Sequence, residues 1–136
     1  MRQVLIDAGP LVALLDEGDR DHRRCVEASK HLIATALTTW PVVTEAMYLL
    51  SDAPVAQDAL LAKIEGGGVR LAGLDGKDVP AMRRLMQKFR ELPMDFADAT
   101  LVRVAEREGI QEVFTLDRRH FVVYRPARGQ AFTIIP

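Results

Sequence analysis

Short, mostly apolar runs alternate with longer segments of helical periodicity along this chain, and this alternation limits the folds it can adopt. The runs span residues 4–6, 37–40, 69–74 and 113–116, with 132–135 as a candidate edge strand. Continuous apolar runs of this length are typical of parallel strands covered on both faces. The pattern therefore predicts an α/β fold, a three-layer α/β/α sandwich with a mostly parallel central sheet of four to five strands.

Helices are expected between the strands, at residues 11–16, 21–32, 41–50, 53–65, 77–92 and 95–109. Gly9-Pro10 should break the chain before the first of them, and Gly109 is a natural end for the last. The helix at 77–92 should bury an apolar stripe that consists of Met82, Leu85, Met86 and Phe89. Trp40, next to Pro41, is expected to be a core aromatic rather than a base-stacking residue. With no repeat or linker, residues 1–136 are expected to form a single domain.

Composition narrows the function classes only a little. The formal net charge is −1, from 18 basic and 19 acidic residues, which argues against a strongly basic coat for nucleic acid. This balance does not exclude a nuclease, because an acidic site cancels basic residues elsewhere. Cys25 is the single cysteine and cannot form an internal disulfide, so we expect a packed thiol in a reducing compartment. No apolar run approaches the ~20 residues of a membrane span, and a cytoplasmic protein is expected.

Four acidic residues stand beside or inside apolar segments, where carboxylates are costly. Asp7 follows the first apolar run and Asp117 the fourth, while Glu45 and Asp98 lie inside apolar helical segments. No lysine or arginine lies inside these stretches to pair with them locally. Ionised carboxylates are almost never fully buried unless they are paired or bound to a metal. The four acids are therefore candidates for one shared site.

The predicted topology brings these acids towards one edge of the sheet. Asp7 and Asp117 each follow the last residue of a predicted strand, and ligands of open α/β sheets bind outside the carboxyl ends of the strands. Glu45 and Asp98 lie about one turn into helices that begin at the same edge. Oxygen-only ligands favour Mg²⁺ or Mn²⁺, which lowers the pKa of a bound water. The sequence contains no zinc-ligand spacing and no phosphate-binding glycine loop.

Four motifs, in this order, resemble those of the PIN-domain family, and in particular the VapC-type toxin ribonucleases of type II toxin–antitoxin systems. They are Leu5-Ile-Asp-Ala-Gly-Pro-Leu-Val12, Thr44-Glu45-Ala46, Asp95-Phe-Ala-Asp-Ala99 with Leu101, and Phe114-Thr-Leu-Asp-Arg-Arg-His-Phe121. The resemblance covers essentially the whole chain and implies a PIN-like fold. It also implies an endoribonuclease that cleaves single-stranded or loop RNA, frequently tRNA, by metal-activated water.

The resemblance further implies roles for individual residues and partners. Asp7, Glu45, Asp98 and Asp117 match the family's catalytic and metal-binding acids, and Thr115 matches a hydroxyl residue that supports them. Mg²⁺ or Mn²⁺ is the implied cofactor. A homodimer and a VapB-type antitoxin, whose C-terminal segment enters or covers the active-site groove, are the implied partners. The chain departs from the family at Ala8-Gly9-Pro10, where a serine or threonine is common.

Structural roles compete with these assignments. Asp7 alone would be interpreted as a turn residue, and Asp117 as the cap of a short helix over residues 118–121. Asp98 fits the third position of a helix whose N-cap is Asp95, a role compatible with metal binding.

For Arg118 and Arg119, contact with substrate phosphates and a solvated surface cluster remain equal alternatives. A catalytically weak PIN module that binds RNA or protein is the alternative function. A phosphatase with an aspartyl nucleophile is disfavoured, because Gly9 stands where a second aspartate would be needed.

Overall fold

The computed structural model describes residues 2–127 and 129–136, and a five-stranded sheet lies at its centre. The strand order is β3-β2-β1-β4-β5, and all four pairings between neighbouring strands are parallel. The strands are β1 (Gln3–Ile6), β2 (Thr35–Thr38), β3 (Val69–Leu71), β4 (Glu112–Phe114) and β5 (Thr133–Ile135). The predicted α/β class and the parallel sheet are confirmed.

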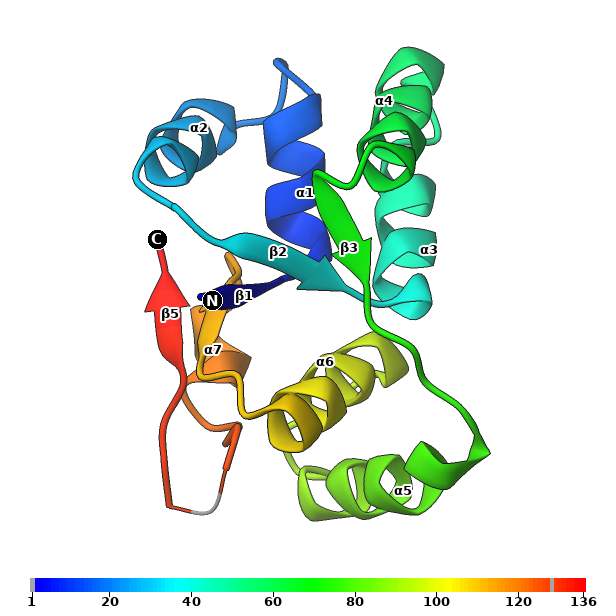
Figure 1. The fold of residues 1–136 in the computed structure, drawn as a ribbon, viewed down its shortest axis with the longest axis vertical. Helices are drawn as coiled ribbons and strands as arrows, with labels where there is room; N and C mark the ends of the chain where they lie inside the picture. Colours follow the sequence, from blue (N-terminus) through cyan, green and yellow to red (C-terminus); the bar gives the residue numbers. More distant parts are fainter. Residues whose placement is uncertain (1, 128) are drawn as a thin grey trace.

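Helices cover the sheet on both sides, so that the three layers follow one another in space (Figure 1). The helices are α1 (Ala8–Leu15), α2 (His22–Lys30), α3 (Trp40–Leu49), α4 (Pro54–Glu65), α5 (Val79–Lys88), α6 (Phe96–Glu108) and α7 (Arg118–Phe121), with a short 3₁₀ turn, η1 (Gly76–Asp78). Helices α1, α2 and α4 lie on one side of the sheet, and α5 and α6 lie on the other (Figure 1). None of the described helices is long and apolar enough to cross a membrane.

The order of the strands creates a switch point beside β1. The chain proceeds from β1 through β2 to β3 in one direction, then crosses back to place β4 on the opposite side of β1. Right-handed crossovers in opposite directions put their helices on opposite faces of a sheet, which explains why α5 and α6 cover the second face. Ligands of open α/β sheets bind where the strand order reverses. Here that place lies just beyond the ends of β1 and β4.

Alternating side chains of the short strands supply both faces of the core. Val4 and Ile6 line a cavity under α1, so Leu5, which is fully buried, faces the other side together with its registered neighbours Leu37 and Val113. Such two-sided burial is the reason for continuous apolar runs in this sequence. The thiol of Cys25 is packed in the same core, as expected.

At two element boundaries, the difference from the prediction changes how a residue is placed. Gly9-Pro10 does not break the chain, because α1 begins at Ala8 and both residues lie in its first turn, where an N–H has no helical partner to lose. Strand β2 begins and ends two residues earlier than predicted, so Trp40 starts α3 instead of finishing a strand. Trp40 is 57% exposed, and its predicted place in the core is wrong.

The predicted apolar stripe of α5 is buried except at one position. Met82, Leu85 and Phe89 are buried, whereas Met86 is 38% exposed and its assignment to the core is wrong. Met86 follows Leu85 by one position, which places it about 100° around the helix from that buried side chain.

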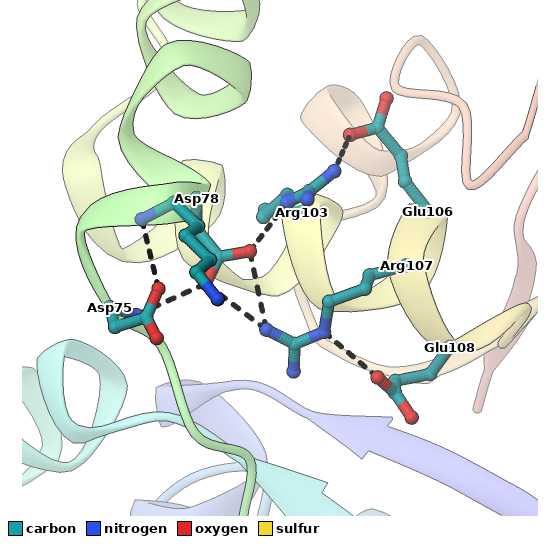
Figure 2. Close-up of polar contacts among 7 residues, drawn as sticks. Asp75, Asp78, Arg103, Glu106, Arg107 and Glu108 are labelled. Atoms are coloured by element: carbon teal, nitrogen blue, oxygen red, sulfur yellow. Dashed lines mark hydrogen bonds and ion pairs between the residues drawn. The ribbon is translucent and has the colours of Figure 1, made fainter.

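The buried carboxylate of Asp78 links η1 and the start of α5 to α6 through hydrogen bonds (Figure 2). The side chain of Asp78 accepts hydrogen bonds from Arg103 Nε at 2.8 Å and from Arg107 Nη1 at 3.2 Å, both on α6. It also accepts the backbone N–H of Asp75 at 3.1 Å, which completes a capping box. The Arg103 hydrogen bond, followed by that of the Asp75 N–H, holds the pKa of Asp78 below its usual range. Asp78 thus stays charged with cationic partners at hand.

Candidate active site

The four predicted acids lie at the carboxyl edge of the sheet, on four different segments. Asp7 follows β1 and is the N-cap of α1, and Asp117 follows β4 and is the N-cap of α7. Glu45 lies in the second turn of α3, and Asp98 in the first turn of α6. The helix α3 begins at this edge because it follows β2 directly, and α6 begins there because it runs back to the opposite end of the sheet, where β4 starts. The switch point of the sheet therefore carries the acids that the sequence singled out.

A threonine hydroxyl joins the two acids that follow strands. Thr115 Oγ1 donates to Asp7 Oδ2 at 2.8 Å and accepts the backbone N–H of Asp117 at 3.0 Å. The other carboxylate oxygen of Asp7 accepts the Ala8 N–H at 2.9 Å. All of these groups lie next to the ends of β1 and β4, so sheet pairing sets their relative positions. Thr115 lies where a supporting hydroxyl residue was predicted.

Asp98 is held by the helix on which it lies and by a distant tyrosine. Asp95 caps α6, since its side chain accepts the backbone N–H of Asp98 at 2.8 Å, as predicted. The hydroxyl of Tyr124 donates to Asp98 Oδ2 at 3.0 Å. Asp98 is only 7% exposed and Tyr124 is fully buried. This aspartate is therefore fixed in orientation before any ligand arrives.

The start of α3 is tied to α6 by a pair of hydroxyls. Thr39, the N-cap residue of α3, shares a 2.7 Å hydrogen bond with Thr100 of α6, and both threonines are fully buried. This contact fixes the start of α3 against the second turn of α6. Because Glu45 and Asp98 lie on these helices, the threonine pair also limits how far the two carboxylates can move apart.

Burial and the charges of neighbouring acids change the pKa values of the carboxyls in this group. Burial, followed by the negative charges of Asp7, Asp95 and Asp117, raises the pKa of Glu45 to about 7. Burial, followed by the charges of Asp95 and Asp7, raises the pKa of Asp98 to about 8, although the Tyr124 hydrogen bond opposes this shift. Burial is also the main cause that raises the pKa of Asp7. Like charges in a partly desolvated site destabilise the ionised forms.

Neutralising cations are missing from this group in the described part of the chain. Within residues 2–127 and 129–136, no lysine or arginine forms an ion pair with Asp7, Glu45, Asp95, Asp98 or Asp117. The contact of Asp117 is with His120 Nδ1 at 2.8 Å. Arg118 and Arg119 are exposed, and Arg118 donates to the carbonyl of Pro136 at 3.0 Å. That bond directs Arg118 towards the end of β5.

The chemistry of the donors suits a hard divalent cation. The site offers carboxylate oxygens and threonine hydroxyls, the ligand types that Mg²⁺ and Mn²⁺ prefer. A cation would favour the ionised forms of the carboxyls whose pKa values are raised. Among the described residues, no three or more His, Cys, Asp or Glu side chains are already arranged to hold one ion. The donor set thus fits such a cation in chemistry, without forming a finished coordination shell.

Three features of the site were missed from the sequence. Tyr124 lies 26 residues from Asp98, and no local pattern connects them. His120 is three residues after Asp117, a spacing that brings side chains together at a helix start, and it could have been proposed. Asp95 was interpreted only as a cap, whereas its charge also raises the pKa values of Asp7, Glu45 and Asp98.

Comparison with solved structures identifies the same fold in proteins of low sequence identity. VapC20 of Mycobacterium tuberculosis, described as a sarcin-ricin loop cleaving toxin, matches with a TM-score of 0.74 at 21% identity, over 81% of this chain and 86% of that one. A toxin–antitoxin complex from Klebsiella pneumoniae matches with a TM-score of 0.66 at 16% identity, over 91% and 94% of the two chains. VapBC2 of Rickettsia felis, bound to a promoter DNA fragment, matches with a TM-score of 0.65 at 11% identity, over 98% and 99%.

Comparison of sequences finds a relative of higher identity than these structures. Ribonuclease VapC26 of Mycobacterium tuberculosis is 34% identical over 139 aligned residues, which cover 98% of this chain and all of the relative. The sequence profile of the PIN domain matches residues 4–126, a span that includes all four predicted acids. On this evidence the chain belongs to the PIN-domain family.

Proposed function

We propose that this protein is an Mg²⁺- or Mn²⁺-dependent endoribonuclease that hydrolyses single-stranded or loop RNA and serves as the toxin of a toxin–antitoxin pair. The observation that carries the proposal is the group of acids at the switch point of the sheet, where burial, together with the charges of neighbouring acids, raises the pKa values of Asp7, Glu45 and Asp98. The similarity to a ribonuclease over nearly the whole chain supports the same activity.

In this proposal Asp7, Glu45, Asp98 and Asp117 would hold the divalent cation. When bound, such an ion lowers the pKa of water and neutralises charge on the phosphate. The remaining residues position the acids. Thr115 orients Asp7 and the backbone of Asp117, and Tyr124 orients Asp98. Hydrogen bonds of this kind to ligating carboxylates fix their orientation, and their loss typically costs 10–100-fold in metal affinity or activity.

A protein partner belongs to the same proposal. The Klebsiella pneumoniae structure is a toxin–antitoxin complex, and the Rickettsia felis structure contains a VapBC pair. A VapB-type antitoxin is therefore the proposed partner of this chain, and a homodimer the proposed assembly. Arg118 and Arg119 are exposed next to Asp117 and remain candidates for contact with substrate phosphates, although the Pro136 contact of Arg118 would have to break.

The direct test is cleavage of total RNA by purified, antitoxin-free protein, with Mg²⁺ or Mn²⁺ compared with EDTA. The wild type should produce discrete fragments only with the metal, and Asp98→Asn should produce none. Asp58→Asn is a matched control, because Asp58 is an exposed acid on α4, away from the site. A folded wild type that leaves RNA from the native host intact under all of these conditions would contradict the proposal. RNA binding without cleavage would favour the alternative, a catalytically weak binding module.

A further inference from the structure

A cleft of about 460 Å³ opens at the same edge of the sheet, outside the group of acids. Its lining includes Trp40 at the start of α3, Phe96 at the start of α6, and Leu71 and Leu74 at and beyond the end of β3. Its volume lies within the ~300–1,000 Å³ range of small-molecule sites. The cleft is therefore large enough for a small planar ligand.

Two large aromatic side chains at this cleft are exposed to solvent. Trp40 is 57% exposed and Phe96 is 52% exposed. The ring contacts of the described residues involve Phe89, His120, Phe121, Tyr124 and Phe132, so neither Trp40 nor Phe96 is stacked on another ring. Aromatic side chains supply much of the apolar area of binding sites, and leaving two of them uncovered at one cleft is unfavourable without a ligand.

Residues that line the cleft are close neighbours in the chain of residues at the acidic site. Phe96 lies in the chain between Asp95 and Asp98, and Trp40 follows Thr39 directly. Thr100 lines the cleft and shares its hydrogen bond with Thr39. The two aromatic residues thus stand at the first positions of two helices that carry acids of the site, and the threonine pair joins those helices. This proximity is what a base adjacent to a phosphate at the acids would need in order to reach the cleft.

The charge of the residues that line the cleft favours an uncharged base over a phosphate as its ligand. Among the described lining residues, Asp75 is the sole ionisable one, and it is an acid. A phosphate in this cleft would meet a carboxylate and no cation, which is unfavourable. An uncharged nucleobase would instead find apolar surface and two aromatic rings, and a carboxylate that accepts hydrogen bonds from base N–H groups.

We propose that this cleft binds one unpaired nucleobase of the RNA substrate, stacked on Trp40 or Phe96, next to the phosphate that occupies the acidic site. This inference rests on the proposed ribonuclease function and adds a contact that would restrict it to unpaired RNA. A base inside a duplex is stacked and paired on both sides, so it reaches such a cleft only from a loop, a bulge or a single strand.

Trp40 is the single tryptophan of the chain, so its fluorescence reports directly on this cleft. Asp98→Asn protein in Mg²⁺ buffer is titrated with short single-stranded RNA, and binding is followed independently by the anisotropy of a label on the RNA. Stacking should quench Trp40 at saturation. A series of RNAs with one abasic nucleotide each should contain one position at which quenching is lost. Unchanged tryptophan emission at full RNA occupancy would overturn the inference.

Cleavage by the wild-type protein and cleft variants supplies the second measurement. Trp40→Ala and Phe96→Ala should each lower kcat/KM on single-stranded RNA by about 10-fold, since stacking contributes ~1–3 kcal/mol per base. Trp40→Phe should restore most of the activity. Tyr48→Ala is the matched control, because Tyr48 is an exposed aromatic on the same helix and does not line the cleft. An abasic nucleotide at the position identified by fluorescence should lower kcat/KM more for the wild type than for Trp40→Ala.

The outcomes separate the inference from the function on which it rests. A wild type that cleaves RNA while all cleft variants cleave equally well retains the ribonuclease function and overturns the base site. Trp40→Ala that weakens binding of a purified antitoxin but leaves RNA cleavage unchanged would assign the cleft to a protein and also overturn it. A wild type that neither binds nor cleaves RNA would overturn both proposals.

Discussion

Two groups of charged residues surround buried carboxylates in this molecule, and they act on those carboxylates in opposite ways. At Asp78, arginines from α6 donate to the carboxylate and its pKa falls below the usual range (Figure 2). At the carboxyl edge of the sheet, Asp98 and Glu45 meet other acids, and their pKa values rise to about 8 and about 7. The first group is complete within the chain. The second brings negative charges together, and no lysine or arginine among the described residues forms an ion pair with them.

The difference separates a structural carboxylate from a functional one. A buried acid that serves stability is most useful when its counterions belong to the same chain, since it then stays neutralised at all times. Acids whose charge is balanced only by a bound ligand are destabilised in their ionised form when that ligand is absent. Perturbed pKa values cluster at functional sites for this reason. The depth of burial alone would not have distinguished the two, because Asp78 and Asp98 are 4% and 7% exposed.

The largest expected effect is on activity at the second group. Asp98→Asn should lower the rate of RNA cleavage by at least about 100-fold, because it removes the charge of a proposed metal ligand while leaving an oxygen that can accept the Tyr124 hydrogen bond. The melting temperature in metal-free buffer at pH 8 should stay the same or rise, since the substitution relieves repulsion among carboxylates. Lost activity together with a lower melting temperature would mean that Asp98 is structural.

At Asp78 we expect the opposite result, a large effect on stability and none on activity. Asp78→Asn should lower the free energy of unfolding by about 2–3 kcal/mol, because Arg103 and Arg107 lose their buried carboxylate partner and keep only Glu106 and Glu108 among the described residues. Denaturant unfolding measures this change, with Asp58→Asn as the control. RNA cleavage per folded molecule should be unaffected. A large drop in cleavage by the folded variant would show that the two groups are not independent.

The pH dependence of stability sharpens the comparison. Carboxyls with pKa values raised in the folded state add stability that is fully present below their unfolded pKa of ~4 and is lost as pH rises through the folded value. In metal-free buffer the melting temperature should therefore fall between about pH 4 and 8, as Glu45 and Asp98 ionise. Mg²⁺ or Mn²⁺ should reduce this fall by stabilising the ionised forms. A metal-free melting temperature that rises steadily over this window would contradict the assigned shifts.

The smallest expected effect concerns the hydroxyl between the two strand-end acids. Thr115→Val keeps the shape of the side chain but removes the donor to Asp7 and the acceptor for the Asp117 N–H. Stability should fall by about 1–2 kcal/mol, and RNA cleavage by roughly 10-fold. Thr115→Ser should retain most of the cleavage, because serine keeps the hydroxyl. Equal cleavage by the valine and serine variants would show that the hydroxyl does not orient the acids.

Residues that follow strand ends could be placed from the sequence, whereas contacts between residues far apart in the chain could not. Asp7 and Asp117 were placed together because each follows an apolar run, and parallel strands end at one edge. The arginines that neutralise Asp78 lie 25 and 29 residues further along the chain, so no local pattern reveals them.

The error at Trp40 arose from an element boundary. Residues 37–40 were predicted as one strand, with Trp40 as a core aromatic next to Pro41, but β2 ends at Thr38 and Thr39 is the N-cap residue of α3. Trp40 consequently occupies the first helical position, where its side chain is exposed at the cleft. Boundaries shift by one or two residues for small energetic reasons, yet such a shift decides whether a large side chain packs in the core or meets a ligand.

The pairing of β1 with β4 has a consequence for when the site can appear during synthesis. The hydroxyl of Thr115 reaches back 108 residues to Asp7, and β4 takes its place beside β1 only after α6 has formed the crossover. A nascent chain that has not yet released β4 and the residues after it from the ribosome lacks both Thr115 and Asp117. The acids of the site are therefore completed only after β4 and Asp117 have left the ribosome, long after Asp7 has been made.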